Sequence, residues 1–180
     1  MTAPPSVKFF STAAHRCSYM PEQRAVTLFA DPKGRMDSHL YSRLSTIGFR
    51  RSGDFVYRPH CGTCNACVSV RLPIDEFTPS RQQKRVWKMN ADIEVIKRPA
   101  EFCDEHYQLY ERYITQRHFD GDMYPPSEEQ YKSFLISDWL DIFFYEFRVN
   151  GKLLAVAVGV FLVAVDLALA GQPGLDRVAD

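Results

Sequence analysis

The chain has 180 residues, of which 46% are apolar and 24% are charged, and its formal net charge is zero. These proportions are close to those of globular proteins and exclude a disordered or fibrous chain. The length allows one large or two small domains, each able to bury a core, so folding needs neither a disulfide nor a metal.

The zero net charge hides an uneven distribution of charge. Residues 1–90 contain 14 Lys and Arg against 6 Asp and Glu, and residues 91–180 contain 8 against 16, which gives +8 followed by −8. A basic half of this kind suits a polyanionic partner such as RNA. A solvated face that is balanced by the acidic half is the alternative interpretation.

The N-terminal residues MTAPPSVKFF lack the features of a secretory signal, so we expect a cytoplasmic protein whose five cysteines stay reduced. Residues 153–171 are apolar over nearly the length of a membrane span, but Asp166 interrupts them. A buried strand is the preferred interpretation of this stretch. We therefore expect no membrane partner, with insertion as the lesser alternative.

The first predicted elements are a helix and two strands. After an extended start, Asp37 is a candidate N-cap of a helix that runs to about Ile47, and Gly48 is its stop. Alternation of apolar and polar residues predicts strands at 54–58 and 67–74 on either side of a turn rich in cysteine. A second helix is predicted after Thr78 and Pro79, and its basic residues share one face: Arg81, Lys84, Arg85 and Lys88.

Residues 92–99 are predicted to form a strand that Pro99 ends, and the domain boundary is placed here because the charge changes sign. The division is thus a basic domain with the cysteines at 1–98 and a second domain at 99–180. In the second domain, helices are predicted at 100–118 and from Ser127 onward. Strands at 142–149 and 152–158 are predicted to form a hairpin with an Asn-Gly turn. The sequence therefore predicts an α+β protein.

Three cysteines are spaced C-x2-C-x2-C, which lets their thiolates converge on one ion. Cys17 is the best candidate for a fourth ligand, and His60 and Cys103 are weaker candidates. The predicted metal ligands are Cys17, Cys61, Cys64 and Cys67. Zinc and an iron-sulfur cluster both accept this set, and partly buried free thiols are the alternative. The other histidines, His15, His39, His106 and His118, lack metal-site spacing and are expected to be structural.

Long stretches of the sequence resemble the bacterial aminoacyl-tRNA-protein transferases, and among them the aspartate/glutamate leucyltransferases. They are CSYMPEQRAVTLFADP at 17–32, LYSRLSTIGFRRSGDFVYRPHCGTCNACVSVRLPIDEFTPSRQQKRVWKMNADIEV at 40–95 and YERYITQRHFDGDMYPPSEEQY at 110–131. The resemblance implies an enzyme of the N-degron pathway of protein degradation, which transfers leucine from leucyl-tRNA to the N-terminal Asp or Glu of proteins. It also implies a fold in which a cysteine-bearing domain precedes a domain similar to the GCN5-related acetyltransferases.

The resemblance also implies roles for basic residues. Arg50, Arg51 and Arg58 are candidates for binding the acidic side chain of the acceptor or the 3′ end of the tRNA, because a guanidinium can bind carboxylate or phosphate bidentately. Arg81, Lys84, Arg85 and Lys88 are candidates for contacts to the tRNA backbone. The alternatives are surface solubility for the three arginines and a solvated helix face for the other four residues. The transfer itself requires no cofactor, although relatives that transfer arginine use cysteines in corresponding segments for a metal or iron-sulfur centre. The catalytic residues are unknown.

The resemblance ends at about residue 158. From about 159 the chain reads GVFLVAVDLALAGQPGLDRVAD, without the further strands and helix that complete the acyltransferase sheet in relatives. We expect an incomplete second domain, an exposed apolar strand and impaired transfer, through a frameshift or truncation. The alternative function is a non-catalytic, cysteine-centred remnant that binds tRNA.

Overall fold

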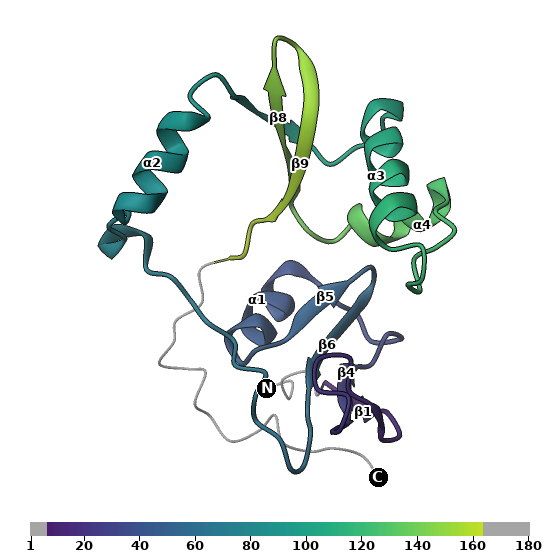
Figure 1. Cartoon of the computed structure of the whole chain (residues 1–180). Coiled ribbons are helices and arrows are strands. Elements are labelled where there is room, and N and C mark those ends of the chain that lie inside the picture. Colours follow the sequence, from purple (N-terminus) through teal and green to yellow (C-terminus); the bar gives the residue numbers. More distant parts are fainter. Residues whose placement is uncertain (1–6, 164–180) are drawn as a thin grey trace, which may run out of the picture. The chain divides into compact units, whose positions relative to one another are not determined.

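The structure is a computed structural model that describes residues 7–163, and it confirms a mixed α and β architecture (Figure 1). The described residues contain four α-helices and three antiparallel sheets. The chain divides into two compact units. Of the described residues, the first unit contains 7–69 together with 162 and 163, and the second runs from Val70 to Phe161.

The first unit is built on a four-stranded sheet with the strand order β1-β4-β6-β5. Its strands are β1 (Phe9–Ser11), β4 (Thr27–Ala30), β5 (Arg50–Ser52) and β6 (Phe55–Pro59). A smaller sheet pairs β2 (His15–Arg16) with β3 (Arg24–Ala25). The predicted strand at 54–58 is confirmed as β6, whereas β5 was not predicted.

One face of the four-stranded sheet is buried beside α1 (Ser38–Thr46). The predicted cap is confirmed, since the Asp37 side chain accepts a hydrogen bond from the Leu40 N–H at 2.8 Å. Gly48 follows with φ +90°, a conformation that L side chains rarely adopt, and so ends the helix as expected. The core of this unit contains these buried residues: Phe9, Leu28, Ala30, Tyr41, Leu44, Phe49 and Val56.

The second unit holds a three-stranded sheet with the order β7-β8-β9. Its strands are β7 (Glu94–Pro99), β8 (Ile142–Val149) and β9 (Lys152–Val160), and its helices are α2 (Arg81–Met89), α3 (Asp104–Arg117) and α4 (Glu128–Leu135). The Asn150-Gly151 turn joins β8 to β9, and both residues have positive φ. All of these elements were predicted from the sequence. Helices α3 and α4 lie on one side of the sheet (Figure 1).

A buried ionic cluster joins α3 to β8. Glu146 on β8 is only 4% exposed, and its two carboxylate oxygens contact His106 Nε2 at 2.7 Å and Arg148 Nε at 2.8 Å. Arg148 also donates to the Glu105 carboxylate. The hydrogen bond from Arg148 lowers the pKa of Glu146 to about 2. Burial opposes this effect, and the contact with His106 adds to it. His106 is therefore structural, as expected.

The predicted strand at 67–74 is wrong. Residues 67–73 form no strand, and Ile74–Glu76 is a short 3-10 helix (η1). The apolar residues of this stretch are exposed, with Val68 at 72% and Val70 at 86%. Alternation alone does not make a strand here, because no neighbouring strand among the described residues supplies hydrogen bonds and no face is covered.

The apolar stretch at 153–171 is a strand only in part. Residues 153–160 lie in β9, whereas 164–171 fall outside the described residues. The expected burial is wrong for much of β9, and the expected exposure of an apolar strand is confirmed there. Leu153 is buried, but Leu154 and Val158 are 45% and 42% exposed, and β9 is an edge strand of the sheet that the described residues form. No helix among the described residues is long and apolar enough to span a membrane.

The predicted domain boundary at residue 98 lies inside β7, which pairs with β8. The compact units divide instead between Ser69 and Val70. The two divisions measure different things, because the predicted boundary follows charge and the compact units follow contacts. The division at 98 stays a prediction.

Replacing Glu146 by Gln should lower the free energy of unfolding by about 3 kcal/mol at pH 7, because Arg148 loses the buried negative charge that it pairs with. The folded pKa of Glu146 lies below that of a free carboxyl group. Ionised Glu146 therefore stabilises the fold above pH ~4.5, and this stability is lost as the pH falls toward 2. Urea unfolding from pH 7 to pH 3 should show a weaker pH dependence in Glu146→Gln than in the parent.

Glu128→Gln is the matched control for this change. Glu128 forms an exposed ion pair with Lys132 at 2.9 Å on α4, so its replacement should cost only about 0.5 kcal/mol. Equal losses for the two variants would contradict the assignment of Glu146 as a buried anchor.

Candidate nucleic-acid interface

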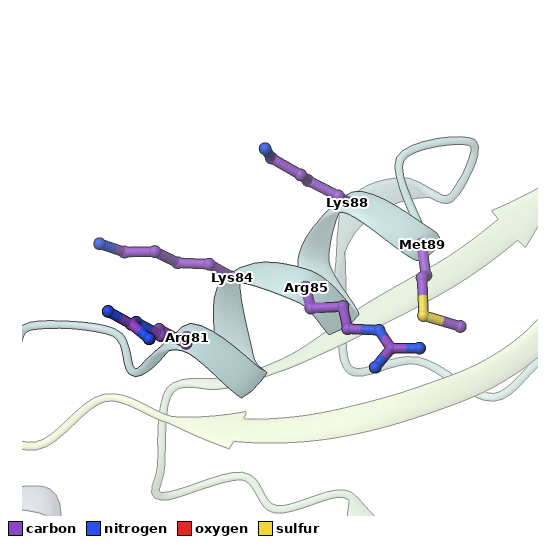
Figure 2. Close-up of a pocket in the computed structure, with 5 residues that line it drawn as sticks. All are labelled: Arg81, Lys84, Arg85, Lys88 and Met89. Carbon is purple, nitrogen blue, oxygen red and sulfur yellow. The ribbon is translucent and has the colours of Figure 1, made fainter.

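Helix α2 presents the predicted basic face. Ser80 caps its N-terminus by accepting a hydrogen bond from the Gln83 N–H at 3.2 Å, and the Gln83 side chain accepts from the Ser80 N–H at 2.8 Å. Four basic residues line a surface hollow together with Met89: Arg81, Lys84, Arg85 and Lys88. In Figure 2, Arg81, Lys84 and Lys88 extend to one side of the helix, and Arg85 extends beside Met89.

The charges of this face are unneutralised within the described part of the chain. None of the four basic residues takes part in an ion pair between described residues. No residue of α2 is buried, and even Trp87 and Val86 are 82% and 51% exposed. The basic residues therefore do not serve packing or internal pairing in the second unit, and they are available to a polyanion.

The structure separates the three candidate arginines of the first unit. Arg50 pairs across the hairpin with Tyr57, whereas Arg51 pairs with Val56. Because side chains alternate between the two faces of a strand, Arg50 points to one face of the sheet and Arg51 to the other. Arg58 follows Tyr57 on β6 and so shares the face of Arg51. The three guanidinium groups therefore do not form a single cluster.

Arg51 and Arg58 have contacts within their own unit. Arg51 Nη1 donates to the Gly53 carbonyl at 2.8 Å, and partial burial lowers the pKa of Arg51, although Tyr41 opposes this effect. Arg58 Nη1 donates to the Ile47 carbonyl at 3.1 Å, and its guanidinium lies 5.2 Å from the centroid of the Phe49 ring. Arg50 is exposed. Of the three, Arg50 is the one best placed for an external ligand.

The cysteines are placed within the first unit but are not gathered into a metal site. All four predicted ligands are free thiols, and Cys67 is exposed. Cys61 Sγ donates to the Val26 carbonyl at 3.8 Å, while Cys17 is tied to the β2–β3 hairpin by its backbone N–H, which donates to Gln23. No group of three or more His, Cys, Asp or Glu side chains between residues 7 and 163 is arranged to hold a metal ion. The four-cysteine site stays a prediction.

The face of the sheet that carries Arg50 also carries aromatic residues that were not predicted from the sequence. Phe29 on β4 pairs with Phe10 on β1 and with Tyr57 on β6. A sequence signal for this set exists: β1, β4 and β6 carry apolar residues at successive positions, such as Leu28 and Phe29. Successive residues of a strand point to opposite faces, so one apolar residue of each pair lies on the face that is not part of the core.

Comparison with known proteins identifies the family. The family described as arginine-tRNA-protein transferase, N terminus, matches residues 15–85, and its C-terminus counterpart matches residues 105–165. An aspartate/glutamate leucyltransferase of Pseudomonas fluorescens (strain Pf0-1) is 55% identical over 158 residues, which cover 88% of this chain and 67% of the relative. The chain belongs to the aspartate/glutamate leucyltransferase family.

Other leucyltransferases of the family match over the same length. One from Pseudomonas aeruginosa (strain LESB58) is 53% identical, again over 88% of this chain and 67% of the relative. One from Alcanivorax borkumensis is 54% identical over 65% of its own length. The chain therefore spans about two thirds of these leucyltransferases. The two family matches leave residues 86–104 between them, a stretch that contains the predicted boundary at 98.

Proposed function

We propose that this chain acts in the transfer of leucine from leucyl-tRNA to the N-terminal Asp or Glu of proteins, as a step of the N-degron pathway. The observation that carries the proposal is 55% identity over 158 residues with a protein named aspartate/glutamate leucyltransferase. The unpaired basic face of α2 supports a polyanionic substrate such as tRNA. A cytoplasmic location follows from this function and belongs to the same proposal.

The reaction is aminolysis of an ester. The acceptor's neutral α-amine attacks the carbonyl carbon that joins leucine to the tRNA ribose, a peptide bond forms, and the ester bond to the ribose oxygen breaks. The proton lost by the amine ends on that oxygen, so no oxidant or cofactor is consumed. Because the ester is already activated, positioning of two large substrates supplies much of the rate. The protein must therefore bind tRNA phosphates and one acceptor carboxylate.

Distinct groups of residues are available for these two tasks. Arg81, Lys84, Arg85 and Lys88 are proposed to contact tRNA phosphates, because they are exposed and unpaired within the described residues. Arg50 is proposed to bind the acceptor carboxylate or the tRNA 3′ end, because a guanidinium can bind either group bidentately. Arg51 and Arg58 are retained as weaker candidates, since each already donates to a backbone carbonyl.

We further propose that the second unit is an incomplete domain of the GCN5-related acetyltransferase type. Its antiparallel β7-β8-β9 sheet with α3 and α4 on one side is compatible with part of such a domain. Zinc or an iron-sulfur cluster at Cys17, Cys61, Cys64 and Cys67 would brace the first unit. The thiols are not gathered around a common point here, so no step of the reaction is assigned to a metal.

Removing three charges from α2 should weaken tRNA binding and its salt dependence. In the triple variant Arg81→Gln, Lys84→Gln, Lys88→Gln, up to three phosphate contacts are lost. The slope of log K against log salt should become shallower by about 2 to 3, because each phosphate contact releases about 0.7 to 0.9 counterions. Fluorescence anisotropy with labelled tRNA between 50 and ~200 mM salt measures the slope.

The matched control removes the same charge from the first unit. Lys33, Arg35 and Arg43 are exposed and lie outside both α2 and the strands of the four-stranded sheet. Their replacement by Gln should leave the slope nearly unchanged. If both triple variants change the slope equally, the attraction is a property of net charge and α2 is no interface.

A second candidate function is tRNA binding without transfer. The specific observation that favours it is the exposure of Leu154 and Val158 on β9, which is an edge strand of the three-stranded sheet within the described residues. A polypeptide of residues 1–180, assayed by itself, should bind tRNA but transfer leucine to an Asp-ended peptide far more slowly than a Pseudomonas relative. Radiolabelled leucine incorporated per minute gives the rate, and turnover equal to that of the relative would reject this candidate.

A further inference from the structure

One face of the four-stranded sheet carries a row of aromatic rings that ends in an arginine. The register pairs Phe10 with Phe29, Phe29 with Tyr57, and Tyr57 with Arg50. One residue from each of the four strands thus lies directly opposite the next. We call Phe10, Phe29 and Tyr57 the aromatic row.

Two rings of the row pack together with Phe55, and Phe10 stands opposite Phe29 on the neighbouring strand. The centroids of Phe29 and Tyr57 are 5.6 Å apart, and Phe55 packs edge-on against Phe29 at 6.0 Å. Phe10 is 47% exposed and Phe55 is 54% exposed. The surface is therefore aromatic, exposed at Phe10 and Phe55 and half-buried at Phe29 and Tyr57.

This composition is unusual for the outer face of an antiparallel sheet. Such a sheet normally buries one face and presents polar residues on the other. Here the inner face is already filled, since Phe9, Leu28 and Val56 are 4% exposed or less. The aromatic row therefore contributes nothing to that core, and its rings need a different explanation.

The charge around the row favours an anionic partner. Arg50 ends the row and is exposed, and Lys8, next to β1, lies on the same face by alternation. Asp31 also lies on this face, opposite Lys8, whose carbonyl accepts a hydrogen bond from the Asp31 N–H at 2.9 Å. The charges of Lys8 and Asp31 offset each other, so Arg50 supplies the net positive charge of this face. Between residues 7 and 69 there are nine Lys and Arg against four Asp and Glu. A partner with flat apolar rings and negative charge fits both properties.

We propose that the aromatic row is a stacking platform for unpaired RNA nucleotides, namely the single-stranded 3′ end of the donor tRNA. Bases stack on exposed Phe and Tyr rings of a sheet, while adjacent cations neutralise the phosphates. Arg50 then binds a phosphate of the strand that crosses the row. The inference rests on the proposed function only for the identity of the RNA.

The test compares two tRNAs that differ only in the unpaired 3′ nucleotides. Phe10→Ala should weaken binding of the intact tRNA about 5- to 30-fold, because one base loses its stacking partner. It should leave binding of the tRNA without the unpaired nucleotides unchanged. Phe10→Leu keeps an apolar side chain but no ring, and should behave like Phe10→Ala. The slope against salt should not change, since stacking releases no counterions.

Two further variants serve as controls. Tyr19 is 75% exposed in the same unit but lies outside the four-stranded sheet, so Tyr19→Ala should bind both tRNAs as the parent does. Tyr57→Phe keeps the ring and should retain full affinity for both tRNAs. Tyr57→Leu should weaken binding of the intact tRNA only. Circular dichroism confirms that each variant is folded before binding is measured.

The outcomes separate this inference from the proposed function. The platform is supported if the folded Phe10→Ala and Phe10→Leu variants lose affinity for the intact tRNA but not for the tRNA without the unpaired nucleotides. This holds even if leucine transfer is absent. Equal binding by the parent and these folded variants, or an equal loss for both tRNAs, overturns it. The α2 triple variant should weaken binding of both tRNAs to the same degree. Its result therefore tests the α2 interface independently of the aromatic row.

Discussion

The register between β4 and β6 is the constraint on which the first unit depends. It places Leu28 and Val56 on the face beside α1, and Phe29 and Tyr57 on the other. A shift of one residue would exchange the two sets. Burial of Leu28 and Val56 therefore fixes both the core and the outward row of rings. The same register decides that Arg50 stands with the rings while Arg51 and Arg58 do not.

The second unit depends on a different kind of contact. Ion pairs and hydrogen bonds join α3 to β8 through Glu146 and Arg148, and apolar packing around Phe144 adds to them. A buried carboxylate is costly unless it is fully paired. Here His106 and Arg148 occupy both of its oxygens, so the cluster also specifies how the helix lies against the strand.

Much of the fold could be predicted from local sequence signals. Asp37 and Ser127 cap helices, and Asn150-Gly151 makes a hairpin, because each of these choices depends on residues close in the chain. The strand predicted at 67–74 failed because a strand requires a distant partner, which alternation does not reveal. The basic face of α2 was predictable from helical spacing. Two features could not be predicted in this way: the placement of Arg50 and Arg51 on opposite faces, and the aromatic row. Both follow from the pairing of strands that are distant in the sequence.

Helix α2 has no buried face, and this has a thermodynamic consequence for any polyanion that it binds. A helix of nine residues is only marginally stable in water without tertiary packing, so the hydrogen bonds between Ser80 and Gln83 carry much of its stability. The four cations keep their spacing only while the helix is formed. The apparent dissociation constant is then the intrinsic one divided by the fraction of molecules with α2 helical. Temperature and solvent, acting on that population, tune affinity without altering a single contact to the ligand.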